Sequence, residues 1–154
     1  MNSNQQFSVS CHILAVLTAY GDAPVTSETI ALSVDTNPVV IRRIMSHLRQ
    51  HGLVESRSGS NGGWRLTRPA SALSLREVYQ AVSHESVLAM HQHPNPDCLI
   101  GGHIQEALGG VFNQAQTAME LALEKFSVAD VLAETLRANL LDRDKRLDMS
   151  DLQN

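Results

Sequence analysis

The side chains in this sequence that could do chemistry are a block of arginines and, outside it, a few histidines and cysteines. Residues 37–68 contain six arginines and one acidic residue, whereas residues 77–154 contain five basic and twelve acidic residues. Guanidinium groups bind phosphates and base edges, so a basic block in a chain of net charge −4 indicates a local docking surface for a polyanion. Ordinary solvated surfaces also carry such charge, so the block alone leaves both interpretations open.

The histidines and cysteines indicate either a metal site or a reactive thiol. His91, His93, Cys98 and His103 carry groups that bind zinc, but their spacing matches no standard zinc motif. A metal-responsive protein is therefore kept as an alternative, and we predict no bound metal and no cofactor. The two cysteines, Cys11 and Cys98, are too few for a disulfide framework, which favours a cytoplasmic protein.

Catalytic and membrane functions find little support in the sequence. There is no glycine-rich phosphate loop that opens a helix, no nucleophile elbow and no carboxylate pair with an evident partner. We therefore expect that the chain is not an enzyme and predict no catalytic residues. Apolar runs fall short of the roughly 20 residues that cross a bilayer. The start of the chain lacks the basic region of a signal peptide.

Three predicted helices lead up to and carry the first part of the arginine block. They span residues 5–20, 27–33 and 38–51. Thr26 is a suitable N-cap for the second helix, and Asn37 followed by Pro38 is a strong start signal for the third. Gly52 is expected to end the third helix, because glycine readily adopts the conformation that follows a helix C-terminus.

A β-hairpin is predicted after the third helix. Residues 53–57 and 64–68 read as two short strands, and the glycine-rich residues 58–63 between them read as the turn. Three helices followed by a hairpin form a winged helix-turn-helix domain. The fold class is therefore expected to be mostly α with a small β-hairpin, the winged helix-turn-helix domain being joined to a long dimerisation helix.

The third helix presents two different faces when its residues are projected at about 100° per residue. Its apolar face consists of Val40, Ile41, Ile44, Met45 and Leu48. The major groove of B-DNA admits one α-helix, so we expect the polar face and the hairpin to contact DNA. The predicted DNA-binding residues are Asn37, Val39, Arg42, Arg43, Ser46, Arg49, Gln50, Arg57, Asn61, Gly62 and Arg65. A winged helix that docks another protein, with arginines serving solubility, is the alternative.

The rest of the chain divides into a linker, long helices and a tail. Ser74 and Glu77 form a capping box that opens a helix through Val82, and a long helix is expected from about Cys98 to Lys125. The predicted domains are a winged-helix DNA-binding domain (1–83), an irregular linker or sensor loop (84–97), dimerisation helices (98–141) and a flexible tail (142–154).

The long helix carries an apolar seam with heptad spacing. The predicted dimer-interface residues on this seam are Ile104, Leu108, Val111, Ala115 and Ala118. A second apolar stripe runs beside the seam, and a helix with two apolar faces needs two partners. A second copy of the chain is the economical partner, so we predict a homodimer. Burial of the helix within a single subunit is the alternative.

Three segments of the sequence together resemble one family of regulators. They run from Asn37 to Ile44, from Leu48 to Val54 and from Gly59 to Leu66, and they resemble the Rrf2 family of dimeric bacterial winged-helix transcription regulators. The likeness covers roughly residues 7–140. It implies a homodimer that binds a palindromic operator in double-stranded DNA through a major-groove helix and a minor-groove wing. We predict a sequence-specific transcriptional regulator that acts as a repressor.

Two departures from the family pattern concern the wing and the cysteines. Many members place arginine directly before the first wing glycine, whereas this chain has Ser58 there and Arg57 one position earlier. Iron–sulfur members carry three clustered cysteines before the long helix, and this chain has only Cys98, so it resembles the cluster-free branch. Asp97 could cap the long helix and place Cys98 in its first turn, where the helix dipole favours a thiolate. We predict that Cys98 is a redox-sensing thiol, with an inert buried cysteine as the alternative. The small effector, if any, is not indicated.

Overall fold

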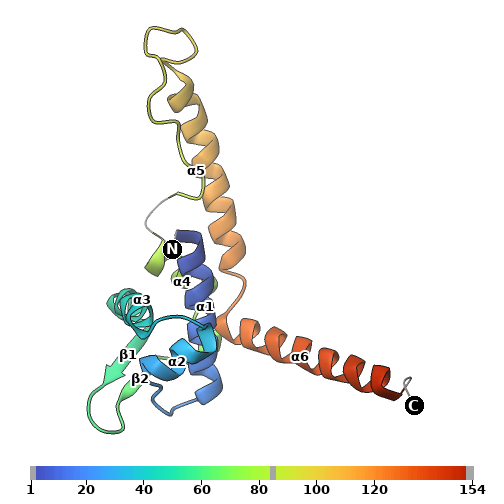
Figure 1. Ribbon diagram of the computed structural model, residues 1–154. Helices are drawn as coiled ribbons and strands as arrows, with labels where there is room; N and C mark the ends of the chain where they lie inside the picture. The colour runs from blue at the N-terminus through green and yellow to red at the C-terminus, as the bar shows by residue number, and fades with distance from the viewer. Residues whose placement is uncertain (1–2, 84–85, 152–154) are drawn as a thin grey trace.

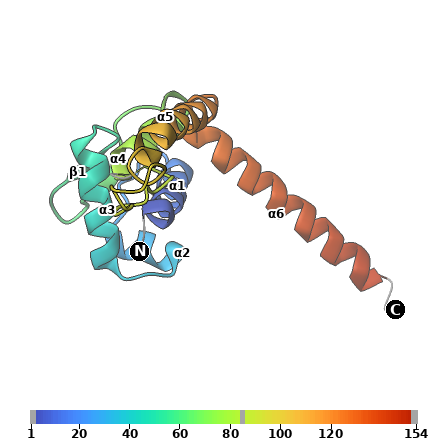
Figure 2. The same ribbon diagram turned by 90° about the horizontal axis from the view of Figure 1, so that it is seen from above.

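The computed structural model describes residues 3–83 and 86–151 of the chain. Within these residues it contains six α-helices, one short 3-10 helix and a two-stranded sheet. The elements are α1 (Ser3–Tyr20), α2 (Ser27–Val34), α3 (Pro38–Gln50), β1 (Val54–Arg57), β2 (Gly63–Leu66), η1 (Ala70–Ala72), α4 (Leu75–Val82), α5 (Ile104–Leu123) and α6 (Val128–Asp151). Helices α1–α4 and the hairpin form a body, from which α5 and α6 project in different directions (Figures 1 and 2).

Local capping signals determine where the helices of the body begin. The Thr26 side chain accepts a hydrogen bond from the Thr29 N–H at 3.2 Å and so caps α2. Asn37 Oδ1 accepts from the Val39 N–H at 2.8 Å and caps α3, and Pro38 follows as the first helical residue. These caps, and the four helices and hairpin that the sequence predicts for the body, are confirmed.

The core of the body is aliphatic. Its fully buried side chains are Ile13, Leu14 and Leu17 from α1, Ile30 from α2, Ile41, Met45 and Leu48 from α3, Val78 from α4, and Val25, Leu53, Val54 and Leu73 from the connecting segments and β1. An edge-to-face contact between Phe7 and Tyr79 closes the core, with ring centroids 5.6 Å apart. Burial of an aliphatic side chain contributes about 1.5–3 kcal/mol, so this core is the main source of stability of the body.

The hairpin is attached to the start of α2 by a second, shorter pairing. Strands β1 and β2 are antiparallel, with Glu55 opposite Arg65 and Ser56 opposite Trp64. Trp64 also exchanges both backbone hydrogen bonds with Val25, at 2.8 and 2.9 Å. A Cβ atom at Gly63 would lie 2.8 Å from the Val25 backbone, so this pairing requires glycine at position 63.

The long helix α5 begins later than the sequence predicts. It begins at Ile104, so the expectation that Asp97 caps it and that Cys98 lies in its first turn is wrong. Gly101 and Gly102, which disfavour a helix, form turns instead. A Cβ atom at Gly101 would lie 2.3 Å from the Asn95 carbonyl oxygen, so the turn packs closely on the preceding loop.

Helix α6 is longer than predicted. Its first residue, Val128, is fully buried against the body, and its backbone remains helical to Asp151, where the sequence predicted a flexible tail over 142–154. No glycine or proline interrupts residues 128–151, so no breaker ends the helix at 142. Residues 152–154 lie outside the described part of the chain. None of the helices in the described residues is both long and apolar enough to cross a membrane.

Candidate nucleic-acid interface

The polar face of α3 is exposed, as its amphipathic pattern predicts. Ile41, Ile44, Met45 and Leu48 are buried on the opposite face. Among the predicted DNA-binding residues, the structure exposes Asn37, Val39, Arg42, Arg43, Arg49, Gln50, Arg57, Asn61 and Arg65, and half-buries Ser46 and Gly62. Val39 leaves 64% of its surface exposed although it is apolar. An exposed apolar residue in the first turn of α3 is suited to contact with a thymine methyl group.

The arginines of α3 have different environments. Arg42 forms an ion pair with Glu28 of α2, whereas Arg43 forms no ion pair within the described residues. The Arg49 guanidinium carbon lies 6.0 Å from the centre of the Trp64 ring, within the range of a cation–π contact. Arg42 is therefore positioned by α2, and Arg49 is positioned by the hairpin.

Glu28 is a residue of this surface that the sequence analysis did not single out. Its own backbone N–H in the first turn of α2, and then the Arg42 guanidinium, lower the pKa of its carboxyl group. Glu28 is therefore ionised at neutral pH and offsets part of the charge of Arg42. Its position in the sequence carries no signal of this role, because the pair joins two helices 14 residues apart.

The hairpin contributes one paired and one unpaired arginine. Arg65 Nε lies 2.5 Å from Glu55 Oε1 across the two strands. Arg57 forms no ion pair within the described residues and lies at the end of β1, next to the glycine-rich turn. Arg57 is therefore the hairpin cation that is free to meet a phosphate or a minor groove.

Trp64 determines how the hairpin sits relative to α3. Its indole Nε1 donates to Ser27 Oγ at 3.0 Å, in the first turn of α2, and its ring lies beside Arg49. The sequence analysis missed this role, although Trp64 is the only tryptophan in the chain and lies in the middle of the basic block. Helix α3 and the hairpin consequently share one side of the body, away from α5 and α6 (Figures 1 and 2).

These features define a class of protein. A single amphipathic helix presents arginines beside a glycine-rich hairpin, and α2 and α3 form the helix-turn-helix that supports it. This is the arrangement in which one helix enters the major groove and the wing approaches the adjacent backbone. The protein is a winged helix-turn-helix, DNA-binding transcriptional regulator.

Comparison with known proteins gives the family. Residues 3–134 match the Rrf2 family, described as an iron-dependent transcriptional regulator, and the chain belongs to this family. YwnA of Bacillus subtilis strain 168, classed among the HTH-type transcriptional regulators, is 42% identical over 130 residues, which cover 84% of this chain and 96% of YwnA.

Two solved structures illustrate the fold. A protein from Lactobacillus plantarum, classed as a transcriptional regulator, superposes with a TM-score of 0.74 at 26% identity, covering 93% of this chain and 97% of that chain. CymR, the global cysteine regulator of B. subtilis, superposes with a TM-score of 0.63 and covers 84% of this chain and 94% of that chain. At 17% identity, the likeness to CymR concerns the fold alone.

The donor groups of this chain do not fit an iron–sulfur cluster. Such a cluster is ordinarily held by four ligands, mostly cysteine thiolates. Cys98 is exposed in the loop before α5, and Cys11 is half-buried on α1. Over residues 3–83 and 86–151, no three His, Cys, Asp or Glu side chains are placed so that together they could hold a metal ion. This includes His91, His93 and His103. The description of the family as iron-dependent therefore does not extend to a cluster held by these residues.

The two thiols have opposite environments. Backbone N–H groups of Gly101 and then Ile100 hydrogen-bond to the Cys98 sulfur and lower the pKa of its thiol. Burial raises the pKa of Cys11 to about 11. The thiolate of Cys98 is thus favoured by a turn, and not by the helix start that the sequence suggested.

A prediction follows for Glu28. Replacing Glu28 with Gln keeps the shape of the side chain but removes the negative charge beside Arg42. With its full charge available to phosphates, Arg42 should tighten binding to duplexes of random sequence, and the log–log salt slope should become more negative by about 0.9 for each chain bound. Fluorescence anisotropy over a range of salt concentrations measures both effects.

Glu134→Gln is the matched control, because Glu134 also forms an exposed ion pair, with Arg137 on α6, away from α3 and the hairpin. It should leave the affinity and the salt slope unchanged. An unchanged slope in Glu28→Gln as well would show that Arg42 does not contact phosphates.

Proposed function

We propose that the protein is a homodimeric repressor that binds a palindromic operator. The observation that carries this proposal is that each chain presents one recognition surface, on α3 and the hairpin, and a long helix, α5, none of whose residues is buried. Two recognition helices related by a two-fold axis read half-sites about 34 Å apart, or a multiple of that distance. A dimer bound across a promoter excludes other proteins from it, so transcription should fall.

Helix α5 supports the dimeric part of the proposal. It has 20 residues and none of them is buried. Its C-terminal half is held to α4 by Arg76, which bonds to Glu120 and Glu124, while Val111 on the seam is 58% exposed. Leu108 is half-buried, and Ala115 and Ala118 are exposed. A second α5 packed on this seam would cover apolar surface that the described chain leaves in water.

The residues of α3 give a test of DNA recognition. Replacing Arg42 and Arg43 together with Ala should abolish operator binding, and each single change should cost about 1–3 kcal/mol per half-site if the arginine reads a base. Selection of binding sites from random duplexes should yield a two-fold symmetric sequence. Its binding should have a log–log salt slope near −5 if the dimer neutralises about six phosphates.

The control for this test is Arg137→Ala, on α6, which should bind like the wild type. A footprint that persists in the double variant would show that α3 does not read the operator. In a purified transcription system, adding wild-type protein should reduce transcripts from a promoter that carries the selected site. An increase would contradict repression.

The seam gives a test of the dimer. Replacing Leu108 and Val111 with Glu would place carboxylates in an apolar contact, where their desolvation is costly. We expect monomers by light scattering and much weaker operator binding, because the second half-site is no longer docked from within one complex. Thr117→Glu, an exposed change on the face of α5 opposite the seam, is the control and should remain dimeric. A dimeric mass in the double variant would place the interface elsewhere.

We further propose that oxidation of Cys98 weakens operator binding. Cys98 lies in the segment that joins the body to α5, so a sulfenate or a disulfide formed there can alter the spacing of the two recognition helices. Its exposure and the lowered pKa of its thiol support this role, whereas the raised pKa of Cys11 disfavours reaction there.

The thiols can be compared directly. Because the pKa of Cys98 is lowered and that of Cys11 is about 11, iodoacetamide at pH 7.5–8 should label Cys98 well before Cys11, as peptide mass spectrometry would detect. Mild hypochlorite should reduce operator affinity in the wild type and in Cys11→Ser, but not in Cys98→Ser. The same response in all three proteins would exclude Cys98 as the sensor.

A further inference from the structure

The loop before α5 lies along that helix and is fastened to it at two points. The Val87 N–H donates to Gln116 Oε1 at 3.2 Å, and Gln105 Nε2 donates to the His91 carbonyl oxygen at 2.6 Å. Between the loop and α5 lies an open cavity of about 660 Å³. We call residues 86–93 the strap.

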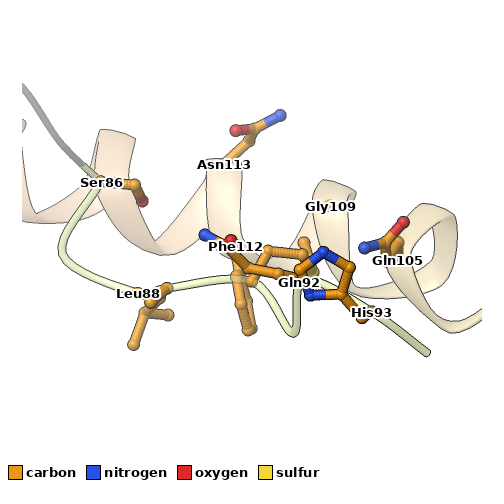
Figure 3. A pocket seen from close by; sticks show the side chains of 10 residues that line it. Ser86, Leu88, Gln92, His93, Gln105, Gly109, Phe112 and Asn113 are labelled. Carbon is orange, nitrogen blue, oxygen red and sulfur yellow. The ribbon is translucent and has the colours of Figure 1, made fainter.

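The cavity is lined by apolar groups with a few polar ones. Leu88 and Met90 of the strap and Phe112 of α5 contribute apolar surface, and Gln92, His93 and Gln105 are among the polar residues. Phe112 extends from α5 toward the strap, and the His93 ring lies beside Gln92 (Figure 3). A volume of a few hundred Å³ with mainly apolar walls and a few polar groups is typical of sites for small molecules.

Gly109 forms part of the wall on α5. A glycine inside a helix costs about 1 kcal/mol relative to alanine, and it is commonly retained where another group approaches closely. Here no described atom lies within 4 Å of the position that a Cβ at Gly109 would occupy. The space that Gly109 leaves open is therefore part of the cavity and is not filled by this chain.

The cavity borders the predicted dimer seam on one side and turns away from it on the other. At about 100° per residue, Gln105 and Phe112 lie only about 40–60° from Leu108, whereas Gly109 and Asn113 lie about 100° or more from both Leu108 and Val111. A second α5 packed on the seam would therefore leave the Gly109 side of the cavity accessible. That side needs an occupant other than the dimer helix.

The lining residues define the chemistry of that occupant. They include no Lys, Arg, Asp or Glu, so apart from the His93 imidazole no ionisable group in the wall would compensate a charged ligand. The ring of Phe112 suits a flat apolar body, and the amides of Gln92 and Gln105 suit a carbonyl or hydroxyl group. We propose that the cavity under the strap binds an uncharged, planar small molecule that carries such a hydrogen-bonding group.

Such a ligand would act as an effector. The strap leads into the segment that contains Cys98, and this segment continues into α5. A ligand under the strap would therefore contact the helix that joins the two halves of the proposed dimer. This regulatory consequence rests on the proposed DNA-binding function. Binding in the cavity does not, because it needs no operator.

The test uses prodan, an uncharged naphthalene ketone whose emission shifts to the blue in an apolar site. Wild-type protein should bind one prodan per chain saturably. Gly109→Leu should weaken binding by at least about tenfold, because the leucine side chain takes the place of the ligand's apolar contacts. Gly110→Leu is the matched control: it also meets no atom within 4 Å, lies outside the cavity lining, and gives the same gain in helix propensity.

Each outcome decides the proposal. Loss of prodan binding in Gly109→Leu alone, with the dimeric mass of the wild type retained, supports the site. Absence of saturable binding to the wild type, equal binding by Gly109→Leu, or equal loss in Gly110→Leu would overturn it. A monomeric Gly109→Leu variant would also overturn it, by showing that the partner chain occupies the cavity. If prodan binds as expected but no operator is found, the proposed function fails and the site remains.

Discussion

The structure depends on the burial of one face of α3. Ile41, Met45 and Leu48 are fully buried, and their helix packs on α2, α4 and β1, so this burial leaves the helix only one orientation. Because side chains on an α-helix repeat about every 3.6 residues, turning these three inward forces Arg42, Arg43 and Arg49 outward. The same apolar contacts that stabilise the body therefore position the residues that we propose contact DNA.

Part of the positive charge on this surface is neutralised by carboxylates of the same chain. Arg42 is paired with Glu28 and Arg65 with Glu55, so two of the exposed arginines meet carboxylates of the same chain. Exposed ion pairs of this kind contribute about 0–1 kcal/mol to stability, so their main consequence is for binding. They reduce non-specific attraction to phosphates while leaving Arg43 and Arg57 available. A regulator that must search among many sequences benefits from weak non-specific binding, because its specificity is the ratio of its affinity for its own site to its affinity for other DNA.

Outside the body, the chain leaves surfaces that its own fold does not complete. Helix α5 buries none of its residues, and the strap is separated from it by a cavity. At the other end, the Leu75 N–H donates to the Phe126 carbonyl and the Val128 N–H to the Leu73 carbonyl, at 2.9 Å each. These bonds fix the α5–α6 junction to the start of α4. The backbone contacts between α4 and this junction therefore set where α5 lies relative to the body.

The sequence by itself determined the elements of the body, because their signals are local. Thr26, Asn37 and Ser74 cap the helices that follow them, and the period of apolar residues identifies the buried face of α3. Tertiary structure alone decided the features that join residues far apart in the chain. The pairing of Trp64 with Val25 and the contact of Arg42 with Glu28 have no local signature. The cavity beneath the strap likewise depends on which groups meet after the chain has folded, because its walls come from the strap and from α5.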